Sequence, residues 1–183
     1  MRILLFILFI FFNMTHEIAN SLLIFDFEKK TDISDWKIVD DVVMGGRSNG
    51  NFYINEKGNG VFEGTVSLEN NGGFSSLRYN FDRKQIDGYK KVKIHLKGDG
   101  KRYQFRVKPN RYDKYSYVSY FRATGEWEVI TLDLADMIPT FRGRRLTELS
   151  NYDAKNLEEI AFLIGNKEEQ NFKLEIDKIE LVK

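Results

Sequence analysis

Apolar and polar side chains alternate along most of the chain after residue 21. Val92, Ile94 and Leu96, for example, are separated by single lysine or histidine residues. A period of two is typical of strands that bury one face and hydrate the other. The pattern predicts strands at residues 22–27, 36–40, 51–55, 60–67, 74–81, 90–97, 102–108, 115–122, 127–133, 158–164 and 171–182.

Turn signals rich in glycine and asparagine, such as Asn49-Gly50 and Gly98-Asp99-Gly100, separate these segments. Residues 160–164 are apolar throughout, which predicts a central strand covered on both faces. In the last strand the alternation slips at Asp177-Lys178, which indicates a β-bulge. Helical signals are few: one turn before Trp36 capped at residues 34–35 or 31–32, a turn near residues 134–138, and a loop with a short helix within residues 145–157.

Many short strands with frequent glycine turns predict an all-β fold, a single β-sandwich of the jelly-roll type. The chain has 183 residues, and neither a repeat nor a proline- and serine-rich linker divides it. One domain is therefore expected over residues 22–183.

The N-terminus reads as a secretory signal. Arg2 is followed by the unbroken apolar run Ile3–Phe12, which is shorter than the roughly 18 residues that a membrane-spanning helix needs. Ala19 and Ser21 supply the small residues that signal cleavage requires. We predict a signal peptide at residues 1–21 and an exported domain, periplasmic, in the cell envelope or secreted, with no membrane span in the mature chain. An uncleaved signal anchor is the alternative.

Composition removes several kinds of chemistry. The sequence contains no cysteine, which excludes disulfides, thiolate nucleophiles and cysteine-ligated metals. Lys and Arg number 28 against 27 Asp and Glu, so the chain has no overall basic surface of the kind that binds nucleic acid. No cofactor is indicated.

Catalytic motifs are weak. His95 is the one histidine after the predicted signal peptide, and it lies on the hydrated face of a lysine-rich strand without a nucleophile motif. Asp40 and Asp41 are adjacent, so on a strand they would point to opposite faces and form no catalytic pair. A hydrolase remains a third, unsupported alternative. Glu28 and Asp177 allow a calcium site between the first and last strands.

Two loops are candidates for binding. Residues 44–50, Met-Gly-Gly-Arg-Ser-Asn-Gly, lack the Lys-Ser/Thr of a phosphate-binding loop. Their glycines fit ordinary turns, or a nest of backbone N–H groups beside Arg47 that faces an anion. Residues 141–145, Phe-Arg-Gly-Arg-Arg, form a local basic cluster that is either solvated or binds a partner.

One sheet face also carries candidate binding groups. Ser76 and Arg78 share a face of their strand, as do Gln104 and Arg106. If both strands belong to one sheet, this face presents planar hydrogen-bonding groups, and Tyr115 and Tyr117 extend it. Planar donors beside aromatic rings suit sugars or peptides. The alternative is an ordinary hydrated face.

Several segments in a fixed order and spacing carry a family resemblance. They are Trp36 and residues 41–48 (Asp-Val-Val-Met-Gly-Gly-Arg-Ser), 62–64, 66–68, 71–78 (Asn-Gly-Gly-Phe-Ser-Ser-Leu-Arg), 98–103, 125–127, 141–144, 160–165 and 172–179. Together they resemble the family of NADH:ubiquinone oxidoreductase complex I intermediate-associated protein 30. The resemblance implies a galactose-binding-like jelly roll, a non-catalytic assembly factor or chaperone, protein partners, no cofactor and no catalytic residues.

The expected function is therefore that of an exported, non-catalytic binding domain that holds a protein partner, through an apolar or mixed patch near the two loops. The alternative is a carbohydrate-binding module of the cell envelope that uses the polar sheet face. The candidate binding residues are Asp41, Arg47, Ser48, Arg78, Gln104, Arg106, Tyr117, Arg142 and Arg144. No metal site is predicted among them.

Overall fold

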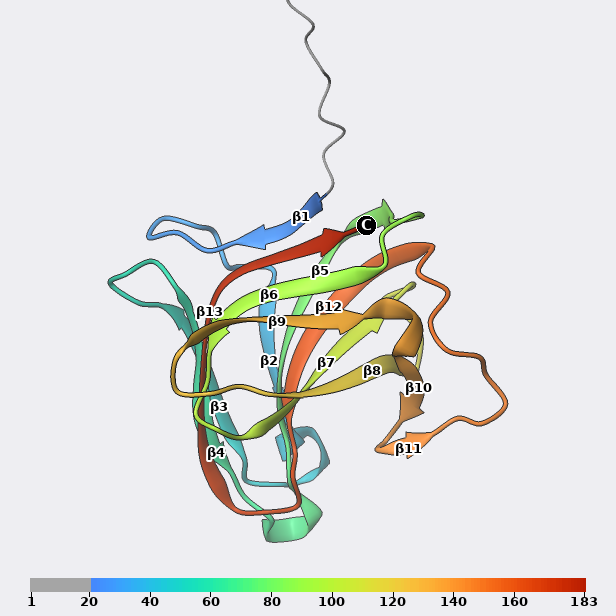
Figure 1. Ribbon diagram of the computed structural model, residues 1–183. Coiled ribbons are helices and arrows are strands. Elements are labelled where there is room, and N and C mark those ends of the chain that lie inside the picture. Colours follow the sequence, from blue (N-terminus) through green and yellow to red (C-terminus); the bar gives the residue numbers. More distant parts are fainter. Residues whose placement is uncertain (1–20) are drawn as a thin grey trace, which may run out of the picture.

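Two antiparallel β-sheets make up the computed structural model, which describes residues 21–183 (Figure 1). The predicted signal peptide lies outside the described residues apart from Ser21, which begins the first strand. Sheet A has six strands in the order β3-β4-β13-β6-β9, with β1 also paired to β13. They are β1 (Ser21–Asp26), β3 (Asn49–Ile54), β4 (Gly60–Val66), β6 (Lys91–Lys97), β9 (Trp127–Asp133) and β13 (Gln170–Val182).

Sheet B has seven strands in the order β11-β10-β8-β7-β12-β5-β2. They are β2 (Trp36–Asp40), β5 (Ser75–Gln85), β7 (Arg102–Lys108), β8 (Ser116–Arg122), β10 (Ile138–Phe141), β11 (Arg144–Arg145) and β12 (Asn156–Ile164). Three short 3-10 turns, η1 (Asp41–Met44), η2 (Glu69–Asn71) and η3 (Leu134–Asp136), complete the regular structure. Within residues 21–183, no helix is long and apolar enough to cross a membrane.

The core lies between the two sheets. Phe62 and Leu174 of sheet A and Phe105 and Phe162 of sheet B are almost fully buried in one apolar cluster. Burial of each such side chain stabilises the fold by roughly 1.5–3 kcal/mol. Because one face of each sheet supplies this core, the alternate residues of every strand point outward and form the two outer faces of the sandwich.

The all-β sandwich predicted from the alternation is confirmed. Every predicted strand is present within a few residues, β12 is central between β7 and β5, and the ladder shifts between Ile176 and Lys178 as the bulge requires. Two expectations were wrong. Residues 145–157 contain no helix, and β10 with β11 was missed because Pro139 lowers the strand signal of a four-residue segment.

Candidate binding surfaces

The Asp41 side chain is a fully buried carboxylate that accepts hydrogen bonds from its own loop and from the start of β5. Its donors are the hydroxyl and the backbone N–H of Ser48 and the backbone N–H groups of Gly73 and Phe74. Burial opposes the charged form, but these hydrogen bonds outweigh it and hold the pKa of Asp41 below its ordinary value. The contacts join the end of β2, the start of β3 and the start of β5.

Glycine is needed at two positions where the backbone passes close to the Asp41 carboxylate. A Cβ at Gly46 or at Gly72 would overlap the Asp41 carboxylate. Asp41 lies in a 3-10 turn, just after the strand predicted at residues 36–40, and the anion that the glycine loop surrounds is the protein's own carboxylate. The nearby Asp40 carboxylate likewise accepts from the N–H of Gly50, at 2.9 Å.

An apolar patch is exposed on the turns that Asp41 holds. Val42 is 59% exposed and Met44 60% exposed on η1, and Leu68, 41% exposed, immediately precedes η2. We call these three residues the turn patch. The two turns lie side by side, because the Asn70 amide donates to the Gly45 carbonyl at 3.0 Å.

Arg47 is at the border of the turn patch. Its guanidinium pairs with Glu69 at 3.1 Å, which adds a second link between the segments around η1 and η2. Both side chains are more than half exposed, so the pair stabilises the fold little. Arg47 is therefore available to a ligand at the cost of one weak ion pair.

Sheet B presents the predicted polar face. Leu77 of β5, Phe105 of β7 and Phe162 of β12 point into the core, so the residues between them point outward. Strand pairing aligns these outward residues in rows that cross the sheet. One row is Lys37, Arg78, Ala161, Arg106, Val118 and Ile138, and the next is Val39, Ser76, Leu163, Gln104 and Tyr120. We call this surface the outer face of sheet B.

Arg78 and Arg106 lie on either side of Ala161, two strands apart and therefore about 10 Å between their Cα atoms. The Arg106 guanidinium is fixed by the Gln104 side-chain oxygen, which accepts from Nε at 2.9 Å and from Nη2 at 2.7 Å. Burial and the nearby charge of Arg78 lower the pKa of Arg106 to about 10. Arg106 stays protonated at neutral pH, but partial burial and the neighbouring positive charge of Arg78 both disfavour its charged form.

Tyr117 is not part of this face. Tyr117 pairs with Val107, a core residue, and its ring packs against Tyr152 with the centroids 5.0 Å apart. The interpretation that placed it beside Arg106 is wrong because the alternation of β8 has the opposite phase. Tyr120, 45% exposed and paired with Gln104, is the aromatic side chain on the outer face, and the Arg102 guanidinium lies 5.0 Å from its ring centre.

Arg142 and Arg144 are exposed on the β10–β11 hairpin, with the Arg142 guanidinium 5.3 Å from the Phe141 ring centre. This hairpin is at one edge of sheet B, whereas η1 follows β2 at the opposite edge. The two predicted loops therefore do not form one surface, and the outer face of sheet B lies between them.

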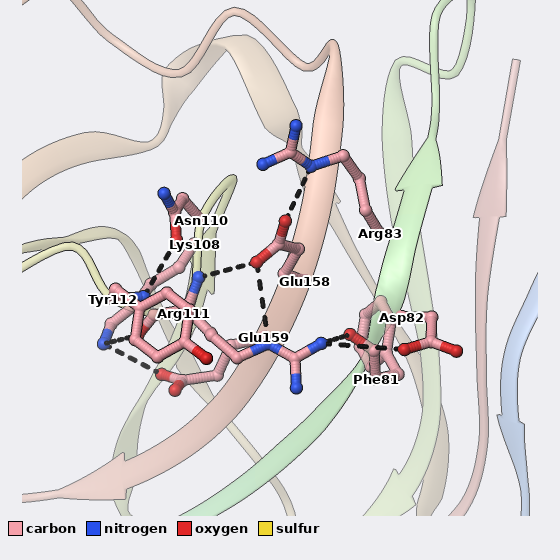
Figure 2. A network of polar contacts seen from close by, with 9 residues as sticks. All are labelled: Phe81, Asp82, Arg83, Lys108, Asn110, Arg111, Tyr112, Glu158 and Glu159. Atoms are coloured by element: carbon pink, nitrogen blue, oxygen red, sulfur yellow. Dashed lines mark hydrogen bonds and ion pairs between the residues drawn. The ribbon is translucent and has the colours of Figure 1, made fainter.

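A network of charged groups fixes the β7–β8 hairpin beside the same face (Figure 2). The Glu158 carboxylate, almost buried, accepts from Arg83 Nε at 2.6 Å and from the backbone N–H of Arg111 at 3.0 Å. The Arg111 guanidinium donates to the Phe81 carbonyl at 2.6 Å. The hydrogen bonds from Arg111 and Arg83 lower the pKa of Glu158. These contacts fix the β7–β8 hairpin to β5 and β12. Tyr112 lies at the tip of the hairpin and is 85% exposed.

His95 and Asp177, the residues considered for catalysis and for a calcium site, lie on sheet A, away from the outer face of sheet B. His95 is half exposed, with Nδ1 2.7 Å from the Asp177 carboxylate. Asp177 itself lies at the bulge of β13. Residues 21–183 contain no group of three or more histidine, aspartate or glutamate side chains able to hold a metal ion.

Comparison with known proteins gives a family and a fold. A family model described as Complex I intermediate-associated protein 30 (CIA30) matches residues 25–176. No curated protein matches the sequence. Among solved structures, the family 11 carbohydrate-binding module of the cellulase Lic26A-Cel5E of Clostridium thermocellum has a TM-score of 0.67 at 15% identity, covering 88% of this chain and 94% of the module.

Two further structures are similar in fold. The family 11 module from Clostridium thermocellum in complex with a β-1,3-1,4-mixed-linked tetrasaccharide has a TM-score of 0.65 at 15% identity, over 88% of this chain and 95% of that one. The agarase AgWH50C has a TM-score of 0.62 at 11% identity, over 90% of this chain but 24% of the agarase. At these identities the likeness establishes the sandwich fold.

The Asp41 contacts generate a stability prediction. Replacing Asp41 with Ala leaves buried N–H donors without an acceptor, so we expect the free energy of unfolding to fall by about 3 kcal/mol in urea denaturation. Asp133→Ala, at an exposed aspartate paired with Lys91, is the control and should change it by less than about 0.5 kcal/mol.

The same contacts predict a pH dependence. Because the folded pKa of Asp41 is lowered, its contribution is present above the ordinary value of 3.8 and is lost as the pH falls through the folded pKa. Asp41→Asn should lack this part of the acid sensitivity. Equal losses for Asp41→Ala and Asp133→Ala would contradict the assignment.

The hairpin network generates a further stability prediction. Glu158→Ala should lower the free energy of unfolding by about 1–2 kcal/mol, because Arg111 and Arg83 lose their acceptor. Hydrogen exchange at the Arg111 amide should accelerate. Asp82→Ala, which removes a distant and exposed partner of Arg111, is the control and should leave that amide unchanged. Unchanged exchange in Glu158→Ala would show that the carboxylate does not fix the hairpin.

Proposed function

Because the chain belongs to the complex I intermediate-associated protein 30 family, we propose that it is an exported, non-catalytic binding domain that holds a protein partner in the manner of an assembly factor. The observation that supports a protein partner is the turn patch. Val42, Met44 and Leu68 expose large apolar side chains together on two adjoining turns. Clustered exposed apolar residues mark interaction sites, whereas single ones are ordinary.

The turn patch is also rigid. The Asp41 carboxylate ties η1 to the start of β5, and the Asn70 amide ties η2 to η1. A preorganised surface loses little conformational entropy on binding. Burial of one of its apolar side chains under a partner contributes roughly 1.5–3 kcal/mol, and Arg47 at the border can exchange Glu69 for an acidic group of the partner.

A substitution in the turn patch tests this proposal. Met44→Asp places a charge in the centre of the contact, so we expect at least about tenfold lower recovery of cross-linked envelope proteins. Val129→Asp is the matched control, since Val129 is exposed to a similar degree, at 56%, on the outer face of sheet A. Equal recovery with both variants would remove the turn patch from the account.

A carbohydrate ligand is the second candidate, and the outer face of sheet B favours it. Gln104, Arg106 and Arg78 present planar hydrogen-bonding groups there, and Tyr120 adds an exposed ring in the same row as Gln104. Sugar rings bind where aromatic faces and planar donors lie side by side. Ser76, Arg78, Gln104 and Arg106, which were expected on this surface, share one face, and Tyr120 occupies the place expected of Tyr117.

Substitution of Tyr120 tests the carbohydrate candidate. Tyr120→Ala removes the ring against which a sugar would pack, so retardation in polysaccharide-containing native gels should weaken about tenfold in apparent affinity. Tyr112→Ala is the control because Tyr112 is exposed at the hairpin tip away from the row of Gln104. Absence of retardation by every polysaccharide, or equal retardation of both variants, would count against this candidate.

A further inference from the structure

The outer face of sheet B gathers positively charged side chains that have no close acidic partner among residues 21–183. The whole chain has a formal charge of +1, and eleven close ion pairs connect its side chains within residues 21–183. None of these pairs involves the cations of this face that are in or beside the two rows. Those cations are Lys37, Arg78, Arg102, Arg106 and Arg122.

The carboxylate in the neighbouring row of β12 is already engaged. Glu159 is buried two residues along β12 from Ala161, on the same face, and pairs with Lys108 at 3.5 Å. The polar partner of Arg106 is instead a neutral amide, Gln104, which orients the guanidinium without neutralising it. Two arginines therefore face one surface, across a single strand, with no acid between them.

The floor between the two arginines is low and apolar. Ala161 separates them, Leu163 follows it on the same face of β12, and Val118 lies on the far side of Arg106; all three are buried although they lie outside the core cluster. A small side chain at the centre leaves the guanidinium groups as the raised parts of the surface. The Ser76 hydroxyl, buried in the neighbouring row, has no hydrogen-bond partner, which is unusual for a buried polar group.

These features match a carboxylate. A guanidinium binds a carboxylate through two parallel N–H···O bonds, and the bonds are stronger where the charge is partly removed from water. Burial and, after it, the charge of Arg78 lower the Arg106 pKa, and an anion placed over Ala161 would relieve the repulsion between the two arginines. Tyr120 and the stacked Arg102 then provide a flat surface for a ring in the adjacent row.

We infer that the outer face of sheet B binds a polysaccharide that carries carboxylate groups, a polymer of uronic acid, with one carboxylate held between Arg78 and Arg106 over Ala161. The inference rests on the carbohydrate candidate above and adds the charge of the ligand. An extended peptide fits less well, because peptides join sheets at free edges, whereas β12 is paired on both sides.

The test compares one polymer in two chemical forms. The purified protein is titrated with polygalacturonate and with the same polymer after reduction of its carboxyl groups to alcohols. We expect binding to the acidic form at low salt, at least tenfold weaker binding to the reduced form, and a decrease in affinity as salt rises. Arg78→Ala and Arg106→Ala should each weaken binding to polygalacturonate at least tenfold.

Arg144→Ala is the matched control. It removes the same charge from an exposed position on β11, away from both rows, and should change the affinity less than twofold. Thermal unfolding of each variant shows that the fold is intact. Arg78 points away from the core and forms no ion pair, so Arg78→Ala should leave the melting temperature nearly unchanged, and its loss of binding can be interpreted even if Arg106→Ala is less stable because Gln104 loses its partner.

The possible results distinguish failure of the carboxylate inference from failure of the carbohydrate candidate on which it rests. Equal binding of the acidic and reduced polymers, lost in Tyr120→Ala, would keep the carbohydrate candidate and overturn the carboxylate inference. Binding of poly-L-glutamate as tightly as polygalacturonate, or an equal effect of Arg144→Ala, would also overturn it, since either shows unspecific attraction of anions. Binding of neither polymer would overturn the carboxylate inference, whereas the carbohydrate candidate is overturned only if the other polysaccharides are not bound either.

Discussion

The buried carboxylate of Asp41 is the contact on which the arrangement of the binding surfaces depends. It stands where the chain leaves sheet B at the end of β2 and enters sheet A at β3, and it also fixes the start of β5. A carboxylate without water must be fully hydrogen-bonded, so the loops around it have one arrangement. That arrangement displays the turn patch and fixes the first residues of β5, the strand that carries Arg78.

Sheet B itself is rigid for a different reason. Its inner face is part of the core, and its central strands are hydrogen-bonded on both sides, so side chains on its outer face project from a backbone that cannot adapt. Such a surface recognises a ligand by the position of its charges and rings. The Glu158 network extends the same rigidity to the β7–β8 hairpin (Figure 2). A rigid sheet and a rigid hairpin suit a binding domain. The turn patch is apolar and suits a protein partner, whereas the outer face of sheet B is charged and suits an acidic carbohydrate.

Much of this organisation can be predicted from the sequence, because a period of two assigns each residue to a face. Ser76 with Arg78, and Gln104 with Arg106, follow from alternation alone. That their strands flank β12 in one sheet does not, since strand order is set by contacts between distant segments. The phase of β8 was misjudged because tyrosine occurs on both of its faces, at Tyr117 and Tyr120. Asp41 looked like a ligand residue because no local pattern shows that a carboxylate bonds inward.

The most direct test of a binding surface on sheet B is a map of amide chemical shifts in the ¹⁵N-labelled protein during titration with an acidic oligosaccharide. The account predicts that the perturbed amides cluster on β5, β7 and β12 around Arg78, Ala161 and Arg106, while the strands of sheet A are unaffected and the oligosaccharide remains intact. Perturbations centred on sheet A, or cleavage of the oligosaccharide during the titration, would contradict it.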